Sequence, residues 1–277
     1  MHRFLNQKWL TAAFGCLVLF LAIRFLIHRI SPKSFPESKS IVTLALAGGP
    51  FECRCYEAEK PIKGIVVLGT GDGGWSYWED NTAKSLSSHG YYVIGWDCRK
   101  FADSRKFNHE QLIDGFNAAV DAASKRVSRK DLSVWYSGWS TGAEQSVAAA
   151  ASERRPANLR GLLLAAPGLR GRFGLETSDL LGVVPSGPGS FALSDFAPEI
   201  ENISVAQIAA DLDPLDSTEW LTSLKVPYRL FEMSNTLHDM GGAGEEFQKV
   251  LLDAIQWTQA NHPISAVVKR LPPRPST

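Results

Sequence analysis

The segment GWSTG at residues 138–142 matches the pattern G-x-S-x-G, which marks a serine at a sharp turn between a strand and a helix. An apolar run over 132–137 precedes it, and an alanine-rich run over 142–151 follows it. Such a turn presents the serine hydroxyl at a helix N-terminus, where the helix dipole favours developing negative charge. The pattern indicates a nucleophilic Ser140. The alternative is that Ser140 only caps a helix at a glycine-rich turn.

A serine nucleophile needs a base, and His238 is the candidate. It lies just beyond the last expected strand and before the closing helix, which is the position of the base in the order Ser, acid, His. The other five histidines fall in the N-terminal segment, at helix ends or past the last helix. The alternative is a solvated loop histidine paired with Asp239.

The acid is expected after the penultimate strand, where the segment DLDPLD at 211–216 offers three carboxylates. Asp213 is favoured because Pro214 stiffens the turn that follows it. Asp211 and Asp216 remain alternatives. The acid would hold His238 in the correct tautomer and stabilise its protonated form.

An acyl-transfer site also needs two donors for the oxyanion. The backbone N–H of Thr141 is one candidate, and the N–H of Asp72 is the other, in the loop GTGDGGW at 69–75. The four glycines of this loop let a backbone approach a ligand closely. A phosphate-binding P-loop is not indicated, because the pattern G-x-x-x-x-G-K-[ST] is absent.

Strand-like apolar runs alternate with helical patterns from residue 41 onward. Strands are expected at 41–47, 51–58, 64–68, 91–96, 132–137, 162–166, 204–210 and 228–231, and helices at 81–89, 109–127, 142–151 and 245–259. This order predicts an α/β fold with a mostly parallel central sheet, helices on both faces and a leading antiparallel hairpin. Its ligand-binding loops follow the carboxyl ends of the strands. Residues 168–200, rich in Gly, Ser and Pro, are expected to form an insertion or lid.

The chain has 277 residues and a net charge of zero, but residues 1–33 carry +5 and the remainder −5. This balance argues against a nucleic-acid partner. The run Trp9–Ile27 holds 19 residues with one charge, Arg24, and reaches about 28 Å as a helix, close to the thickness of a bilayer core. We expect residues 1–30 to form an uncleaved membrane anchor. A cleaved signal peptide is disfavoured because no small-residue cleavage site follows the apolar run, and a buried helix of a soluble protein is the other alternative.

The rest of the chain divides into a polar linker at 31–40, an α/β domain at 41–265 and a loose tail at 266–277. Four cysteines are too few for a disulfide scaffold, and no Cys or His cluster predicts a metal or other cofactor. Cys53 and Cys55 fall on one strand face and do not readily bridge each other. Two possibilities remain open: Cys98 forms a disulfide with Cys53 or Cys55, or all three are buried free thiols.

Four segments resemble the VirJ/AcvB family of bacterial virulence proteins, which has the α/β-hydrolase fold. GDGGW at 71–75 is similar to the family's S-G-D-G-G-W. GYYVIGWD at 90–97, followed by SRK at 104–106, is similar to its strand and S-R-K segment. GWSTGAE at 138–144 is similar to G-Y-S-F-G-A-D, and His238 matches the final loop. The family's G-G-H-H-F-D-G-D run appears here as NTLHDM, with one histidine.

The resemblance implies a periplasmic protein at the bacterial inner membrane. Some members hydrolyse aminoacylated phosphatidylglycerol and release lysine, which implies an esterase acting on an aminoacyl ester. Trp75, Trp139 and Glu144 are the candidate substrate-binding residues, and Glu144 or Asp72 is expected to pair with a cationic aminoacyl group. The alternative for Glu144 is a first-turn carboxylate that stabilises its own helix.

Two other functions remain open. One is a non-catalytic binding or assembly factor, because VirJ-like proteins are associated with secretion of virulence factors and a fold does not dictate a function. The other is a soluble cytoplasmic hydrolase without a true anchor.

Overall fold

A computed structural model describes residues 40–263 of the chain. The expected anchor at 1–30, nearly all of the expected linker and the expected tail lie outside the described residues. Within 40–263, no helix has both the length and the apolar character needed to cross a membrane. All of the described residues belong to one compact unit.

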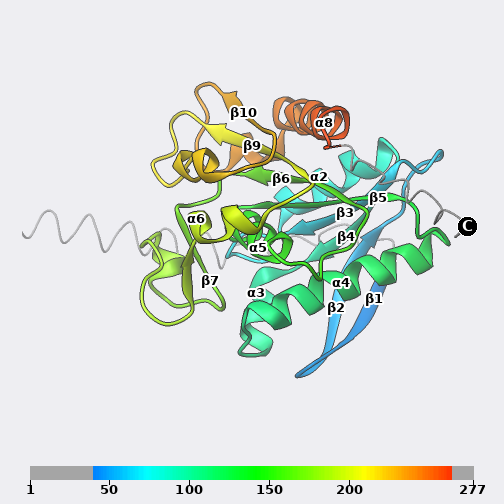
Figure 1. Ribbon diagram of the computed structural model, residues 1–277, viewed down its shortest axis with the longest axis horizontal. Helices are drawn as coiled ribbons and strands as arrows, with labels where there is room; N and C mark the ends of the chain where they lie inside the picture. Colours follow the sequence, from blue (N-terminus) through cyan, green and yellow to red (C-terminus); the bar gives the residue numbers. More distant parts are fainter. Residues whose placement is uncertain (1–39, 264–277) are drawn as a thin grey trace, which may run out of the picture. The chain divides into compact units, whose positions relative to one another are not determined.

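One eight-stranded sheet organises the described residues (Figure 1). Its strands are β1 (Ser40–Leu46), β2 (Gly49–Tyr56), β3 (Gly64–Gly69), β4 (Tyr91–Trp96), β5 (Ser133–Trp139), β6 (Leu159–Ala165), β9 (Ser204–Ala210) and β10 (Tyr228–Met233). Their order across the sheet is β1-β2-β4-β3-β5-β6-β9-β10. β1 and β2 form the expected antiparallel hairpin, β2 is antiparallel to β4, and all other pairs are parallel. The predicted strands are therefore confirmed, with ends that shift by a few residues.

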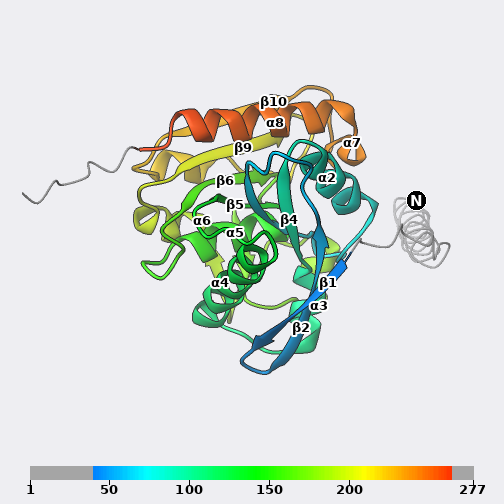
Figure 2. The ribbon, with the colours of Figure 1, turned by 90° about the vertical axis from the view of Figure 1, so that its right-hand side faces the viewer.

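Helices cover both faces of this sheet. They are α2 (Tyr77–Ser88), α3 (Cys98–Ser104), α4 (His109–Arg126), α5 (Thr141–Ala150), α7 (Met240–Ala243) and α8 (Glu245–Ala260). α3, α4 and α5 share one apolar core with Ile65 and Val67 of β3, whereas α2, α7 and α8 share the other with Val66 and Leu68. Side chains alternate along a strand, so a strand between two helical layers must be apolar throughout. β3, β4 and β9 are buried at every position for this reason. Figure 2 shows the β1–β2 hairpin and α8 at opposite ends of the sheet.

Three of these helices differ from the sequence expectation, and one of them is the four-residue α7, which was not predicted. α2 begins four residues earlier than predicted because a capping box starts it at Ser76. The Ser76 side chain accepts from the Trp78 N–H, and the Glu79 carboxylate accepts from the Ser76 N–H. α3 was not predicted; its seven residues are too few for a clear period, and Asp97 caps it by accepting from the Lys100 N–H.

The three described cysteines are free thiols. Cys53, Cys55 and Cys98 are each at most 1% exposed, and burial raises the pKa of all three. Of the two possibilities that the sequence left open, the buried free thiol is confirmed for these residues.

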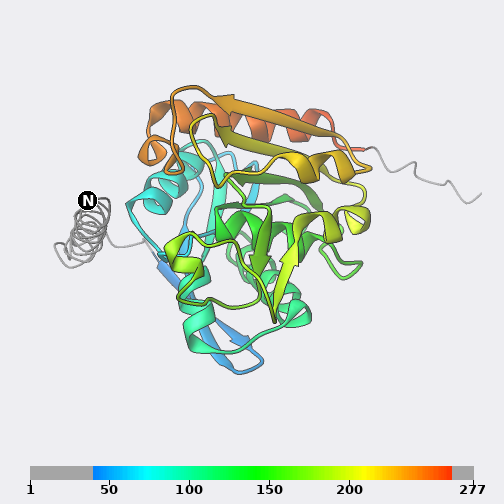
Figure 3. The same ribbon diagram turned by 90° about the vertical axis from the view of Figure 1, so that its left-hand side faces the viewer.

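Residues 168–200 are more regular than expected. They contain a small hairpin of β7 (Arg170–Arg172) and β8 (Ser190–Ala192), the 3₁₀ turns Asp179–Leu181 and Ala197–Glu199, and α6 (Leu193–Phe196). Figure 3 shows this segment, in yellow-green, on the side facing the viewer.

Arg172 fastens this segment from within. Its buried guanidinium donates to Asp179 at 2.8 Å and to the carbonyls of Ser186 and Pro188, both at 2.8 Å. Fork-like Arg bonds of this kind fix geometry as well as charge. One side chain therefore closes the loop that joins the two strands of the hairpin.

Replacing Arg172 should loosen residues 173–189 locally. In Arg172→Met the Asp179 carboxylate loses its buried partner, a change that costs about 3–5 kcal/mol in other proteins. We expect limited proteolysis to cut this segment at least tenfold faster, with the cut mapped by mass spectrometry. Arg129→Met is the matched control, since its ion pair with Asp131 is exposed. Equal cleavage of both variants would contradict this account.

Candidate active site

Ser140 occupies the turn between β5 and α5 with a positive φ of 52° and ψ of −120°. A serine is strained in this region of backbone space, and such strain concentrates at functional sites. Ser140 occupies the N-cap position of α5, but its side chain makes no capping hydrogen bond. Its backbone N–H donates to Ala165 at the end of β6 at 2.9 Å, which holds the turn against the sheet.

Close backbone packing explains the glycines of the motif. A Cβ on Gly142 would lie 2.4 Å from the carbonyl of Gly69 at the end of β3, and a Cβ on Gly138 would lie 2.3 Å from Gly142. Real Cβ contacts are never this short. The first turn of α5 therefore touches β3 directly, and this contact sets where Ser140 projects.

The structure brings His238 and Asp213 together from two different loops. His238 Nδ1 lies 2.6 Å from Asp213 Oδ2, and the Asp213 side chain is fully buried while that of His238 is 29% exposed. A carboxylate acceptor places the ring proton on Nδ1 and leaves Nε2 free as a base. Asp213 also accepts from the Leu215 N–H, which fixes its second oxygen.

The other two aspartates of this loop have structural partners instead. Asp211 accepts from the Thr236 N–H and so ties the acid loop to the loop that carries His238. Asp216 accepts from the Ala210 N–H and from Gln207, and burial raises its pKa to about 7. Of the three carboxylates the sequence offered, Asp213 alone bonds His238.

Trp139 connects the nucleophile turn to the base loop. Its indole N–H donates to the His238 carbonyl at 2.8 Å, and the two rings lie 5.4 Å apart. On its other side it stacks on Trp78 at 5.2 Å. Since Trp139 immediately precedes Ser140, these contacts place His238 beside the serine turn. The ring expected to contact substrate also positions the base loop.

The loop at 69–75 lies against this turn. A Cβ on Gly71 would meet the Trp139 ring at 3.0 Å, and the Gly71 N–H donates to Glu79 at 3.3 Å. Within residues 40–263, the N–H groups of Asp72 and Thr141 have no hydrogen-bond partner. Both proposed oxyanion donors are therefore available.

Glu79 is a residue that the sequence analysis missed. Its buried carboxylate accepts from the Ser76 N–H, the Ser76 hydroxyl and the Gly71 N–H, so it ties the oxyanion loop to the start of α2. The spacing S-x-x-E over 76–79 was a readable capping signal immediately after the glycine loop. What the pattern did not show is that the same carboxylate reaches back to Gly71.

Glu144 and Trp75 have different surroundings from those expected. Glu144 is 7% exposed and accepts from the Gly168 N–H, and burial, with Asp72 and Asp179 nearby, raises its pKa to about 8. It packs under residues 168–171 and is largely protonated at neutral pH. The Trp75 ring lies on Gly95 of β4 and stacks on Tyr56 at 5.9 Å. Trp75 stays half-exposed and lines a cavity with Asp97 and Arg99, so its expected contact with substrate remains a prediction.

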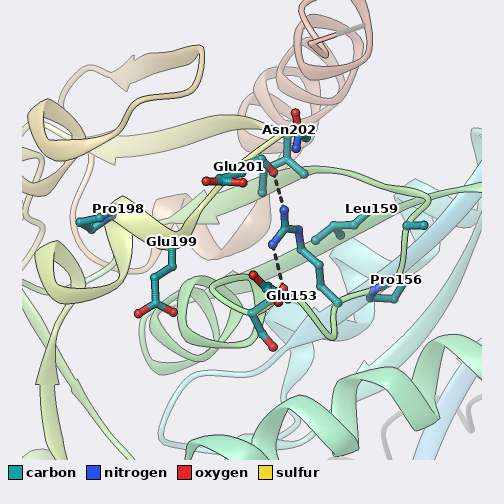
Figure 4. A pocket seen from close by; sticks show the side chains of 11 residues that line it. Glu153, Pro156, Leu159, Pro198, Glu199, Glu201 and Asn202 are labelled. Carbon is teal, nitrogen blue, oxygen red and sulfur yellow. Dashed lines mark hydrogen bonds between the residues drawn. The ribbon is translucent and has the colours of Figure 1, made fainter. Parts of the chain in front are cut away.

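A cavity of about 710 Å³ lies elsewhere in the described residues, with Glu153, Glu199 and Glu201 around it (Figure 4). Leu159, which lines it, begins β6, whereas Ser140 bonds the far end of the same strand. The cavity therefore lies at the amino ends of the strands and contains no part of the serine site.

Comparison with known proteins identifies the family of the chain and its fold. The sequence profile of the family described as bacterial virulence protein (VirJ) matches residues 63–211. No curated protein sequence matches the chain at a significant level.

Three similar solved structures show the same fold. The dienelactone hydrolase of Anabaena variabilis gives a TM-score of 0.59 at 19% identity, over 80% of this chain and 97% of its own. Est1E of Butyrivibrio proteoclasticus gives a TM-score of 0.60 at 13% sequence identity, and the match covers 80% of this chain and 100% of Est1E. XC6422 of Xanthomonas campestris is a serine hydrolase without a lid. It gives a TM-score of 0.54 at 18% sequence identity, and the match covers 80% of this chain and 96% of XC6422. The predicted α/β-hydrolase fold is confirmed.

The raised pKa of Glu144 predicts a pH dependence of stability. The folded carboxyl titrates near 8 and the unfolded one near 4.5, so unfolding releases a proton between these values and stability falls as pH rises through that window. Glu144→Gln keeps the acceptor for Gly168 and removes this titration. We expect the loss of unfolding free energy between pH 5 and 8.5, measured with urea, to shrink by about 1–3 kcal/mol.

Glu199→Gln, which removes an exposed carboxyl, is the matched control and should follow the wild type. Parallel curves for wild type and Glu144→Gln would contradict the assignment.

Proposed function

The chain belongs to the bacterial virulence protein (VirJ) family, and on that premise we propose that it is a serine hydrolase that cleaves carboxylic esters. The observation that carries the proposal is the 2.6 Å contact between His238 and Asp213, fastened by Trp139 to the strained Ser140 turn. The α/β-hydrolase fold supports it, because the similar structures include a dienelactone hydrolase and a serine hydrolase.

The residues perform the reaction in two steps. The Ser140 hydroxyl attacks the ester carbonyl while His238 Nε2 takes its proton and passes it to the departing alcohol. A water molecule, activated by the same nitrogen, then attacks the acyl-enzyme and releases the acid. Asp213 keeps the Nδ1 proton in place and stabilises the ring when it is charged.

The oxyanion of each tetrahedral intermediate is held by the N–H groups of Thr141 and Asp72. Removing one such donor costs other enzymes about 3–4 kcal/mol of transition-state stabilisation. The Gly69–Gly142 contact and the Glu79 bond to Gly71 support this role, since they fix both donors before substrate arrives.

The proposed substrate is an aminoacyl ester of phosphatidylglycerol at the periplasmic face of the inner membrane. The apolar run Trp9–Ile27, proposed as a single-pass anchor, supports a lipid substrate. Asp72 supports a cationic aminoacyl group, because its carboxylate lies in the oxyanion loop. Glu144 supports it less well, since its carboxyl is largely protonated at neutral pH.

Labelling by a fluorophosphonate probe tests the activated serine. We expect the full chain in detergent to label, Ser140→Ala not to label, and His238→Ala and Asp213→Asn to label about 10³–10⁴-fold more slowly. Asp211→Asn is the matched control for the acid and should stay within about threefold of wild type, because Asp211 bonds Thr236 and not His238.

Absence of labelling in a well-folded wild type would overturn the hydrolase and favour a binding or assembly factor. Rapid labelling of Asp213→Asn with slow labelling of Asp211→Asn would move the acid to Asp211.

Charge selectivity tests the aminoacyl substrate. Asp72→Asn keeps the backbone donor and removes the carboxylate, so kcat/KM should fall about fivefold on lysyl-phosphatidylglycerol and stay within twofold on a neutral ester. One ion pair with partial solvent exposure accounts for a change of about that size. Full activity of Asp72→Asn, alone and combined with Glu144→Gln, on the lysyl lipid would reject the cationic substrate.

A further inference from the structure

Large apolar side chains are exposed on three loops around His238 and Asp213. We call them the apolar rim: Leu181, Val183, Val184, Leu212, Leu215 and Leu237. Each is between 42% and 60% exposed. Water contact at six large apolar residues is unfavourable, and an exposed group of this kind marks an interaction site.

The three loops form one continuous surface. A Cβ on Gly182 would lie 3.9 Å from the side chain of Leu215, which joins the 168–200 segment to the acid loop. The Leu212 N–H donates to the Thr236 carbonyl at 3.1 Å, which joins the acid loop to the base loop. Leu212 precedes Asp213 and Leu237 precedes His238, so the rim borders the acid and base directly.

Exposure of this kind is concentrated at this edge of the sheet. Within residues 40–263 four other large apolar or aromatic side chains are exposed, and Tyr77 and Leu169 also follow the carboxyl ends of strands. Only Ile41, in β1, and Tyr228, at the start of β10, lie elsewhere. A random scatter would not favour the loops that hold the catalytic residues.

We propose that the apolar rim docks on the surface of a lipid bilayer and delivers esters from the bilayer to Ser140. This inference rests on the proposed function and adds the surface through which substrate arrives. The length of chain outside the structure supports a bilayer as the occupant. Twelve residues separate Ile27 from Ser40 and span at most about 40 Å when extended. That reach is similar to the diameter of a domain of this size, so the rim can touch the membrane that holds the apolar segment.

The charges beside the rim indicate how it docks. Asp211 and Asp239 are exposed next to Leu212 and Leu237, and the rim itself carries no Lys or Arg. Attraction to anionic lipid therefore does not drive the contact, and burial of the apolar side chains does. A bilayer of phosphatidylcholine should suffice.

A fluorescence measurement tests the contact without relying on activity. The full chain with Cys16→Ser is reconstituted in phosphatidylcholine vesicles and labelled with an environment-sensitive maleimide at Val184→Cys or, as the matched control, at Ile41→Cys. The buried thiols of Cys53, Cys55 and Cys98 do not compete, since each is at most 1% exposed. We expect nitroxide-headgroup lipid to quench the Val184 label at least threefold more than the Ile41 label.

Equal quenching of the two labels would overturn the proposal. So would a Val184 label that is shielded from aqueous iodide but not quenched by lipid, because a second copy of the chain or another protein would then cover the rim.

A kinetic measurement tests the consequence. In Leu181→Gln/Val183→Gln/Val184→Gln, turnover of a long-chain ester embedded in the vesicles should fall at least tenfold, while turnover of soluble p-nitrophenyl butyrate stays within twofold. Ile41→Gln/Tyr228→Gln is the matched control and should leave both rates unchanged. Equal effects of the rim variant on both esters would overturn the proposal.

The two failures are distinguishable. If the wild type turns over neither ester, the proposed hydrolase fails, and the quenching measurement still decides whether the rim meets lipid.

Discussion

The contact between the first turn of α5 and the end of β3 is the constraint on which the site depends. Gly142 and Gly69 meet backbone to backbone, at a separation that leaves no space for a Cβ on either residue. This contact holds Ser140 at a positive φ and keeps the Thr141 N–H beside the oxyanion loop. The strain at Ser140 is maintained because the sheet and the helix on either side are both deeply buried.

Carboxylates that are equivalent candidates in the sequence have different hydrogen-bond partners in the structure. Asp213 faces His238, Asp211 holds the two loops together, and Asp216 braces the acid loop against β9. Glu79 accepts from the Gly71 N–H and so holds the oxyanion loop. The half-buried Asp216 and the buried Glu79 thus fix the acid loop and the oxyanion loop, and in the proposed reaction they would keep the reacting groups in position before substrate binds.

The outer part of the site follows a different physical rule. Polar contacts fix the inner residues, whereas the loops around them expose leucine and valine to solvent. The hydrogen bonds of Arg172 keep the loop at 173–189 folded, and Leu181, Val183 and Val184 of that loop remain exposed. The proposed hydrolysis of a bilayer ester would use both features, a rigid polar centre and an apolar surface that tolerates lipid.

The sequence by itself determined the sheet, the serine turn at 138–142 and the family. Apolar runs bounded by glycine and proline located the eight strands of the sheet, because a strand covered on both faces must be apolar throughout. The GWSTG turn and His238 were also readable, since their chemistry depends on residue type and on order along the chain.

Only the tertiary structure decided which aspartate meets His238, that Glu79 holds Gly71, and that Trp75 packs on Gly95 while Trp139 holds the base loop. These outcomes depend on contacts between segments far apart in the chain, such as Asp213 with His238 or Trp139 with the same loop. Spacing along the sequence carries no information on which of several equivalent side chains a distant loop will face, because packing of the whole domain makes that choice.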